Sequence, residues 1–162
     1  MAHLNDALRA LLDGRHIASL ATFDADGGIH QTPIWYLFEH DRLFVESAAS
    51  SRKVRNVAAR PTASLMIDTR RPGSERWLCA SGTADIIRGA QAQAINERIR
   101  QRYMTKVAIE DPRVGPVFAA VDDVTIALTA RTWRAWDMKS VDDQFFGGIL
   151  GATPEKWYLP PE

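Results

Sequence analysis

The sequence predicts a small α+β domain built around an antiparallel β-barrel, and three observations support this prediction. Strand-length apolar segments follow one another as successive hairpins with turn signals between them. Helical segments are few and do not alternate with the strands, which disfavours a parallel α/β sheet. The chain has 162 residues, a length that suits one domain with a core that needs neither disulfides nor metals. We therefore expect one domain over residues 1–162, with six to seven strands and peripheral helices.

The first third of the chain predicts a short helix followed by three strands. The leucines at helical spacing are Leu4, Leu8, Leu11 and Leu12. Gly14 is a natural stop for that helix. An Asp-Gly turn then separates the apolar segments 16–23 and 29–38, which predicts a hairpin. Pro33 in the second of these strands indicates an edge, a bulge or a rim position. A further turn leads to a third strand at 43–47.

The rest of the chain continues this pattern of short strands with a few helices. A helix that starts at Ser51 should end before Arg60-Pro61, because a residue that precedes proline avoids the helical region. Proline also breaks the chain at Asp111-Pro112 and Gly115-Pro116. We expect the tail 139–162 to pack over the surface. The other expected elements are helix 51–59, strand 62–69, strand 76–87, helix 90–103, and strands 124–129 and 132–137.

Composition limits the classes of function. Twenty Lys and Arg residues balance twenty Asp and Glu residues, so the chain lacks the electrostatic footprint of a nucleic-acid or membrane-surface protein. The single Cys79 excludes an internal disulfide and suits a reducing compartment. No signal sequence and no bilayer-length apolar run is evident. We expect a soluble cytoplasmic protein with no nucleic-acid or membrane partner.

Positive charge gathers where the second helix should begin, at Arg52, Lys53 and Arg55. Arginine offers a bidentate fork for phosphate, lysine a mobile point charge, and a helix N-terminus free N–H groups. Ser51 would donate its hydroxyl and backbone amides, and Asn56 or Arg55 would brace the site. The alternative is a solvated helix face. The helix dipole disfavours cations at this end, however, so the cluster favours an anion site.

No other set of residues predicts chemistry of its own. The histidines are His3, His16, His30 and His40, and none pairs with a second ligand at metal-binding spacing. Cys79 fits a small buried residue better than a nucleophile. We expect neither a metal site nor a catalytic side chain. Trp35 and Tyr36 are neighbours on an expected strand, so they should point to opposite faces, one of them outward as a ring platform or dimer contact.

In their order, these segments resemble the split-barrel flavin-binding superfamily, which includes the pyridoxamine 5'-phosphate oxidase-like proteins and the deazaflavin-dependent reductases. The resemblance covers roughly residues 4–138. Residues 31–36, 43–47, 51–56, 60–66, 75–84 and 133–136 carry it. The resemblance implies an FMN-binding split barrel that works as a homodimer, with two cofactors at the subunit interface.

The resemblance also implies a cofactor site. The cofactor would be FMN or, alternatively, the deazaflavin coenzyme F-420, with its phosphate on Ser51, Arg52 and Lys53. Trp77 and Trp136 would approach the ring from a neighbouring strand or from the second subunit. The implied cofactor-binding residues are Gln31, Thr32, Pro33, Ile34, Trp35, Ser47, Ser51, Arg52, Lys53, Asn56, Trp77 and Trp136.

The implied function is that of an oxidoreductase, which transfers a hydride between the cofactor and a small unsaturated or quinone-like substrate. The chain departs from the true oxidases. Gln31 stands where they usually carry a basic residue, and their C-terminal Arg-rich motif is missing. We therefore do not expect activity on vitamin B6 phosphates. A non-catalytic dimer that binds or senses a flavin- or haem-type ligand is the alternative, and a structural dimer with an empty site is a third hypothesis.

Overall fold

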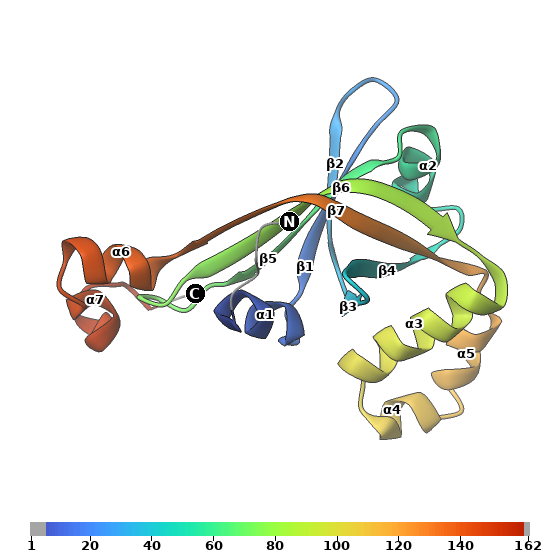
Figure 1. Cartoon of the computed structure of the whole chain (residues 1–162). Coiled ribbons are helices and arrows are strands. Elements are labelled where there is room, and N and C mark those ends of the chain that lie inside the picture. The colour runs from blue at the N-terminus through green and yellow to red at the C-terminus, as the bar shows by residue number, and fades with distance from the viewer. Residues whose placement is uncertain (1–5, 161–162) are drawn as a thin grey trace.

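Seven antiparallel strands form one sheet, in the spatial order β2-β1-β5-β6-β7-β4-β3. This computed structural model describes residues 6–160. The sheet curls into a half-barrel, and β6 and β7 form the long ribbon through its middle (Figure 1). The strands are β1 (Ala18–Phe23), β2 (Ile29–Ile34), β3 (Leu37–Glu39), β4 (Arg42–Ala48), β5 (Thr62–Thr69), β6 (Arg76–Ile87) and β7 (Asp123–Asp137).

Helices α3 to α7 lie at the two ends of the sheet, whereas α1 and α2 pack against the core between them. In Figure 1, α3, α4 and α5 lie together at one end, whereas α6 and α7 lie beyond the opposite end of the β6–β7 ribbon. No helix within residues 6–160 is long and apolar enough to cross a membrane. The helices are α1 (Asp6–Asp13), α2 (Arg52–Ala59), α3 (Gly89–Tyr103), α4 (Lys106–Glu110), α5 (Gly115–Ala120), α6 (Met138–Phe145), α7 (Ile149–Ala152) and the 3-10 turn η1 (Pro154–Lys156).

The predicted α+β class and the succession of hairpins are confirmed. Strands β5 and β6 have the bounds expected from the sequence. Alternation places Ala63, Leu65 and Ile67 in the core, as apolar residues two apart on a strand share one face. Helix α1 ends just before Gly14, and Leu4 lies outside the described residues. Pro33 lies on β2, an edge strand of the sheet, as expected.

The expected strand 29–38 is wrong as a single strand. The chain leaves the sheet at Trp35 and Tyr36, between β2 and β3. These two side chains therefore do not alternate across a strand, and both contact the ring of Tyr103 on α3. The Trp35 ring stacks on it with a centroid distance of 5.1 Å, and the Tyr36 ring meets it edge-on at 6.5 Å. Packing against α3 has overridden the strand propensity of this segment.

The two late strands expected from the sequence are one strand, β7. Its pairing with β6 shifts register between Ser81 and Gly82, where Arg131 is the extra residue of a bulge. A bulge absorbs one residue and lets a long strand bend without ending it. Gly82 is required at this bend, because an added Cβ would lie 2.1 Å from the Thr129 carbonyl oxygen.

Short helices also occur where the sequence predicted only breaks. Pro116 lies in the first turn of α5, where its missing N–H leaves no helix hydrogen bond unmade. In the tail, Asp137 caps α6. The buried Asp142 accepts hydrogen bonds from the backbone N–H groups of Leu150, at 3.1 Å, and Gly151, at 2.8 Å. These bonds hold α6 and α7 together beyond the tip of the ribbon.

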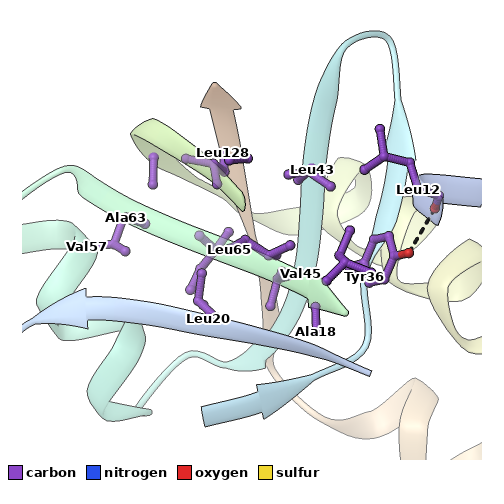
Figure 2. Packing of buried hydrophobic residues seen from close by; sticks show 14 of the residues in the cluster. Leu12, Ala18, Leu20, Tyr36, Leu43, Val45, Val57, Ala63, Leu65 and Leu128 are labelled. Atoms are coloured by element: carbon purple, nitrogen blue, oxygen red, sulfur yellow. Dashed lines mark hydrogen bonds between the residues drawn. The ribbon is translucent and has the colours of Figure 1, made fainter. Parts of the chain in front are cut away.

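The main hydrophobic core lies inside the curl of the sheet and beneath α1 and α2. Figure 2 shows Leu20, Val45 and Leu65 packed together, with Tyr36 at the edge of this cluster. The Tyr36 hydroxyl lies 2.9 Å from the carbonyl oxygens of Leu12 and Gly14, which the end of α1 leaves without helical partners. This contact fixes Tyr36, and with it the neighbouring Trp35, against the rest of the fold.

Candidate functional site

The expected anion site lies where β4 turns into α2. Ser51 is the N-cap of α2, and its hydroxyl accepts a hydrogen bond from the Val54 N–H at 3.4 Å. Serine suits this position because its oxygen satisfies an N–H group that the first helical turn leaves free. The Ser51 hydroxyl also lies 2.8 Å from that of Ser47, the last buried residue of β4. Two predicted cofactor residues therefore share one hydrogen bond at the helix start.

Arg52 is already paired within the fold. Its guanidinium donates to both oxygens of Asp24, from Nε at 2.7 Å and from Nη2 at 2.5 Å. Asp24 belongs to the β1–β2 turn, so this fork ties the turn to α2. The hydrogen bond from Arg52, followed by that from Asn56, holds the pKa of the Asp24 carboxyl below its usual value. Much of the charge of Arg52 is thus neutralised before any ligand arrives.

Asn56 braces the same connection from inside. It is buried, and its side-chain amide donates to the Thr22 hydroxyl at 3.1 Å and to Asp24 at 2.9 Å. From the sequence, Asn56 or Arg55 is expected to brace the site. Arg55 is exposed and donates to the Ser50 carbonyl oxygen, so it stabilises the turn before α2.

Lys53 is the cation that remains. It is half-buried, and it forms no ion pair or hydrogen bond with any other residue of the range 6–160. Burial lowers the pKa of its ammonium group, because the charged form loses solvation without gaining a partner. Together with the N–H groups of the first helical turn, Lys53 gives this corner of the fold the capacity to hold an anion.

A cavity of about 510 Å³ lies next to this corner, and four of the predicted cofactor residues line it. Those four are Pro33, Ile34, Trp35 and Ser47. The broad face of Trp35 is fixed by its stacking on Tyr103. The complete lining is Ile17, Pro33, Ile34, Trp35, Glu46, Ser47, Ala48, Phe118 and Asp123. A mostly apolar cavity with few polar groups is typical of sites for small ligands and cofactors.

Charged residues that the sequence analysis did not single out form one wall of the cavity. Glu46 and Asp123 line it, and the buried Arg100 of α3 contacts both. The Arg100 guanidinium also lies over the ring of Phe118, at 4.7 Å from its centroid. The one signal in the sequence was a glutamate after the apolar residues 43–45. Nothing in the sequence linked it to partners on α3 and β7.

The remaining predicted residues are spread over two places. On β2, Gln31 is exposed, whereas the Thr32 hydroxyl is buried and has no hydrogen-bond partner in residues 6–160. Trp77 and Trp136 face each other across β6 and β7. Trp136 lines a second hollow, of about 650 Å³, near the base of α6, and neither tryptophan lines the first cavity. Within one chain, the structure does not bring these tryptophans to the other predicted residues.

The residues present fit a phosphate-bearing aromatic cofactor. A mostly apolar cavity lies beside a helix start that carries two hydroxyl groups and the unpaired Lys53. The orphan hydroxyl of Thr32 shares a strand face with Ile34 of the cavity lining. A buried polar group without a partner is unfavourable and fits a position that a ligand satisfies. In residues 6–160 no three His, Cys, Asp or Glu side chains are grouped to hold a metal ion.

Comparison with protein families identifies the chain. The model of the pyridoxamine 5'-phosphate oxidase family matches residues 4–137, and the protein belongs to this family. The superfamily expected from the resemblance is therefore confirmed. A search of curated proteins finds no match.

Solved structures share the fold at low sequence identity. A conserved hypothetical protein of Mycobacterium tuberculosis is 23% identical, with a TM-score of 0.70 over 87% of this chain and 91% of its own. An F-420 reductase is 22% identical, with a TM-score of 0.63 over 78% of this chain and 94% of its own. A haem storage protein of Vibrio cholerae is 15% identical, with a TM-score of 0.63 over 83% of this chain and 94% of its own. At these identities the likeness concerns the fold alone.

Proposed function

We propose that this protein is a flavin- or deazaflavin-dependent oxidoreductase. The observation that carries the proposal is the mostly apolar cavity beside the start of α2, where Ser51 and the unpaired Lys53 can hold a phosphate. The family is described as pyridoxamine 5'-phosphate oxidase, and one of the solved structures with the same fold is an F-420 reductase. The cofactor would be FMN or, alternatively, coenzyme F-420.

Each part of the site then has one task. Ser51 and Lys53 bind the phosphate, and Arg52 keeps the β1–β2 turn against α2 through Asp24. Trp35 and the cavity side of β2 hold the ring and exclude water. When bound, the cofactor supplies hydride transfer to or from a small unsaturated or quinone-like substrate. The residues of the chain orient that substrate and set its polar surroundings.

We further propose that the protein acts as a homodimer in the cytoplasm. Trp77 and Trp136 lie outside the cavity of their own chain, so they would reach a cofactor only from a second copy. The tail also exposes apolar side chains that a partner would cover: Phe145, Phe146, Ile149, Trp157 and Leu159. Exposed apolar clusters of this kind often mark interaction surfaces. Sedimentation of the full chain as a monomer at micromolar concentration would contradict the dimer.

The second candidate function is non-catalytic binding of a flavin- or haem-type ligand. The haem storage protein with the same fold motivates it. The cavity disfavours a haem ligand, because its lining includes no His, Cys, Met or Tyr to serve as an axial iron ligand. The better-supported version of this alternative is a protein that binds a flavin or a deazaflavin without turnover.

Turnover separates the two functions. The protein is loaded with reduced FMN or reduced coenzyme F-420 and mixed with a benzoquinone, and absorbance follows oxidation of the cofactor. We expect oxidation that depends on the quinone and is faster than that of the free cofactor at equal concentration. Tight binding without this acceleration would support the storage or sensing function. Binding of neither cofactor would contradict the oxidoreductase and the flavin- or deazaflavin-binding form of the second function.

A further inference from the structure

Two carboxyl groups, those of Glu46 and Asp123, line the cavity, and the guanidinium of Arg100 contacts both of them. Arg100 Nε donates to Glu46 Oε1 at 2.8 Å, and Arg100 Nη2 contacts the same oxygen. Arg100 Nη2 also lies 3.6 Å from Asp123 Oδ2. The exposed fraction of the side chain is 10% for Arg100 and 13% for each of the two acids. Two acids therefore share one base in a nearly closed setting.

The charge of this cluster is unbalanced if both acids are ionised. One negative charge would then lack a counter-charge, although the group is mostly out of water. Two carboxyl groups in close contact avoid this state when they hold one proton between them. Burial raises the pKa of Glu46, and the nearby Asp123 raises it further, whereas the hydrogen bond from Arg100 opposes both effects.

Among the residues that line the cavity, only Glu46 and Asp123 carry a charge, and Lys53 lies in the neighbouring corner at the start of α2. The charged groups with the largest effect on the pKa of Glu46 are Arg100 of α3 and Asp123 of β7. A second ion pair between α3 and the sheet, Arg98 with Glu39 at 3.0 Å, has one acid for one base. Anchoring α3 therefore needs no second carboxyl group, and the extra acid at the cavity calls for another role.

We propose that Glu46 and Asp123 share one proton at neutral pH, and that Glu46 delivers this proton to the substrate during its reduction. The second half of this inference rests on the proposed oxidoreductase function. Hydride addition at one end of a polarised double bond leaves an electron pair at the other end. The O–H bond of Glu46 breaks, its proton forms the new bond at that end, and the carboxylate left behind is held by Arg100. Water then returns a proton to the pair.

Infrared spectroscopy of the ligand-free protein tests the shared proton without any turnover. The wild type should show the C=O band of a protonated carboxyl group at neutral pH, with a shift in D₂O. Glu46→Gln should remove this band because it removes the protonated carboxyl group, and Asp123→Asn should remove it because Glu46 then has Arg100 to itself and ionises. Glu39→Gln, which alters the matched ion pair outside the cavity, should keep it. A wild type without the band, or a band that persists in both single variants, overturns the shared proton.

Kinetics of the loaded protein test the delivery of that proton. Glu46→Gln should lower kcat about 100-fold or more, the range of general acid catalysis, with KM little changed. The wild-type kcat should fall as the pH rises through the apparent pKa of the pair, and the variant should lack this dependence. An unchanged kcat in Glu46→Gln overturns the donor role. If no cofactor binds the wild type, the proposed function and the donor role both fail, and the infrared result still decides the shared proton.

Discussion

Two arginine–carboxylate clusters lie near the β4–α2 turn, that of Arg52 and that of Arg100. They combine the same kinds of side chain but serve different purposes. The pair of Arg52 and Asp24 is balanced, one base for one acid, and 57% of the Arg52 side chain is exposed. The cluster of Arg100 with Glu46 and Asp123 is nearly buried and has one acid too many. The first cluster fastens a turn to a helix. The second keeps a proton at the wall of a cavity, which a balanced pair has no reason to do.

The largest difference between the clusters should appear when each loses its base. Arg100→Met leaves two buried carboxyl groups without a counter-charge, which should lower the free energy of unfolding by about 3–5 kcal/mol. Urea titration of the variant measures this loss. Arg98→Met, which removes the base of the more exposed pair with Glu39, is the control and should lose less than about 1 kcal/mol. Equal midpoints for wild type and Arg100→Met would contradict the buried character of the cluster.

Within the first cluster, the buried amide should matter more than the exposed arginine. Asn56→Ala leaves the Thr22 hydroxyl buried without its donor, which should lower the free energy of unfolding by about 1–3 kcal/mol. Thr22→Val in the same background should recover part of the loss, since it removes the hydroxyl that has lost its donor and retains only a long hydrogen bond, of 3.5 Å, to the His30 carbonyl oxygen. If the double variant were as unstable as Asn56→Ala, the hydrogen bond between Asn56 and Thr22 would not be the source of the lost stability.

The two clusters should also respond to pH with opposite sign. Because the pKa of Glu46 is raised in the fold, its contribution to stability falls as the pH rises from its usual value of 4.5 to the raised pKa, and is constant above that. Because the pKa of Asp24 is lowered, its contribution is complete above 3.8 and is lost as the pH falls below that value. Unfolding free energies of Glu46→Gln and Asp24→Asn, each subtracted from wild type across pH, should show these two trends. Parallel trends would contradict the comparison.

The smallest effect on stability should come from Arg52→Ala. Its ion pair with Asp24 is largely open to water, so its removal should shift the urea midpoint only slightly, and less still at high salt. A double-mutant cycle with Asp24→Asn isolates the pair. A coupling energy as large as the loss expected for Arg100→Met would show that the exposed cluster behaves like the buried one.

Local signals account for the parts of the structure that the sequence predicted well. The alternation of apolar residues predicted which face of β5 is buried. Ser51 indicated where α2 begins, because its side chain caps the helix from the residue before the first turn. The interruption of the strand at Trp35 and Tyr36 was not predicted, because it depends on the ring of Tyr103, which lies far along the chain. The short helices α4 and α5 escaped as well, because single turns of helix owe their stability to packing.

The candidate site divides in the same way. The cationic residues at α2 were visible because they are neighbours in sequence. Their pairing was not, since the acid that binds Arg52 lies 28 residues earlier. Glu46 and Arg100 are 54 residues apart, and no local pattern links them. Sequence therefore indicates where charge gathers, while the fold decides which charges are already paired.

We propose that the cavity and the start of α2 bind a phosphate-bearing cofactor, with Lys53 as its free cation. The decisive experiment is a fluorescence titration of wild type, Lys53→Ala and Arg52→Ala with FMN and with coenzyme F-420. We expect the wild type to bind one of the two, Lys53→Ala to weaken that binding by about 1.5–3 kcal/mol as for other charge-assisted hydrogen bonds, and Arg52→Ala to change it only a few-fold. Equal affinities of wild type and Lys53→Ala, or binding of neither cofactor, would contradict the claim.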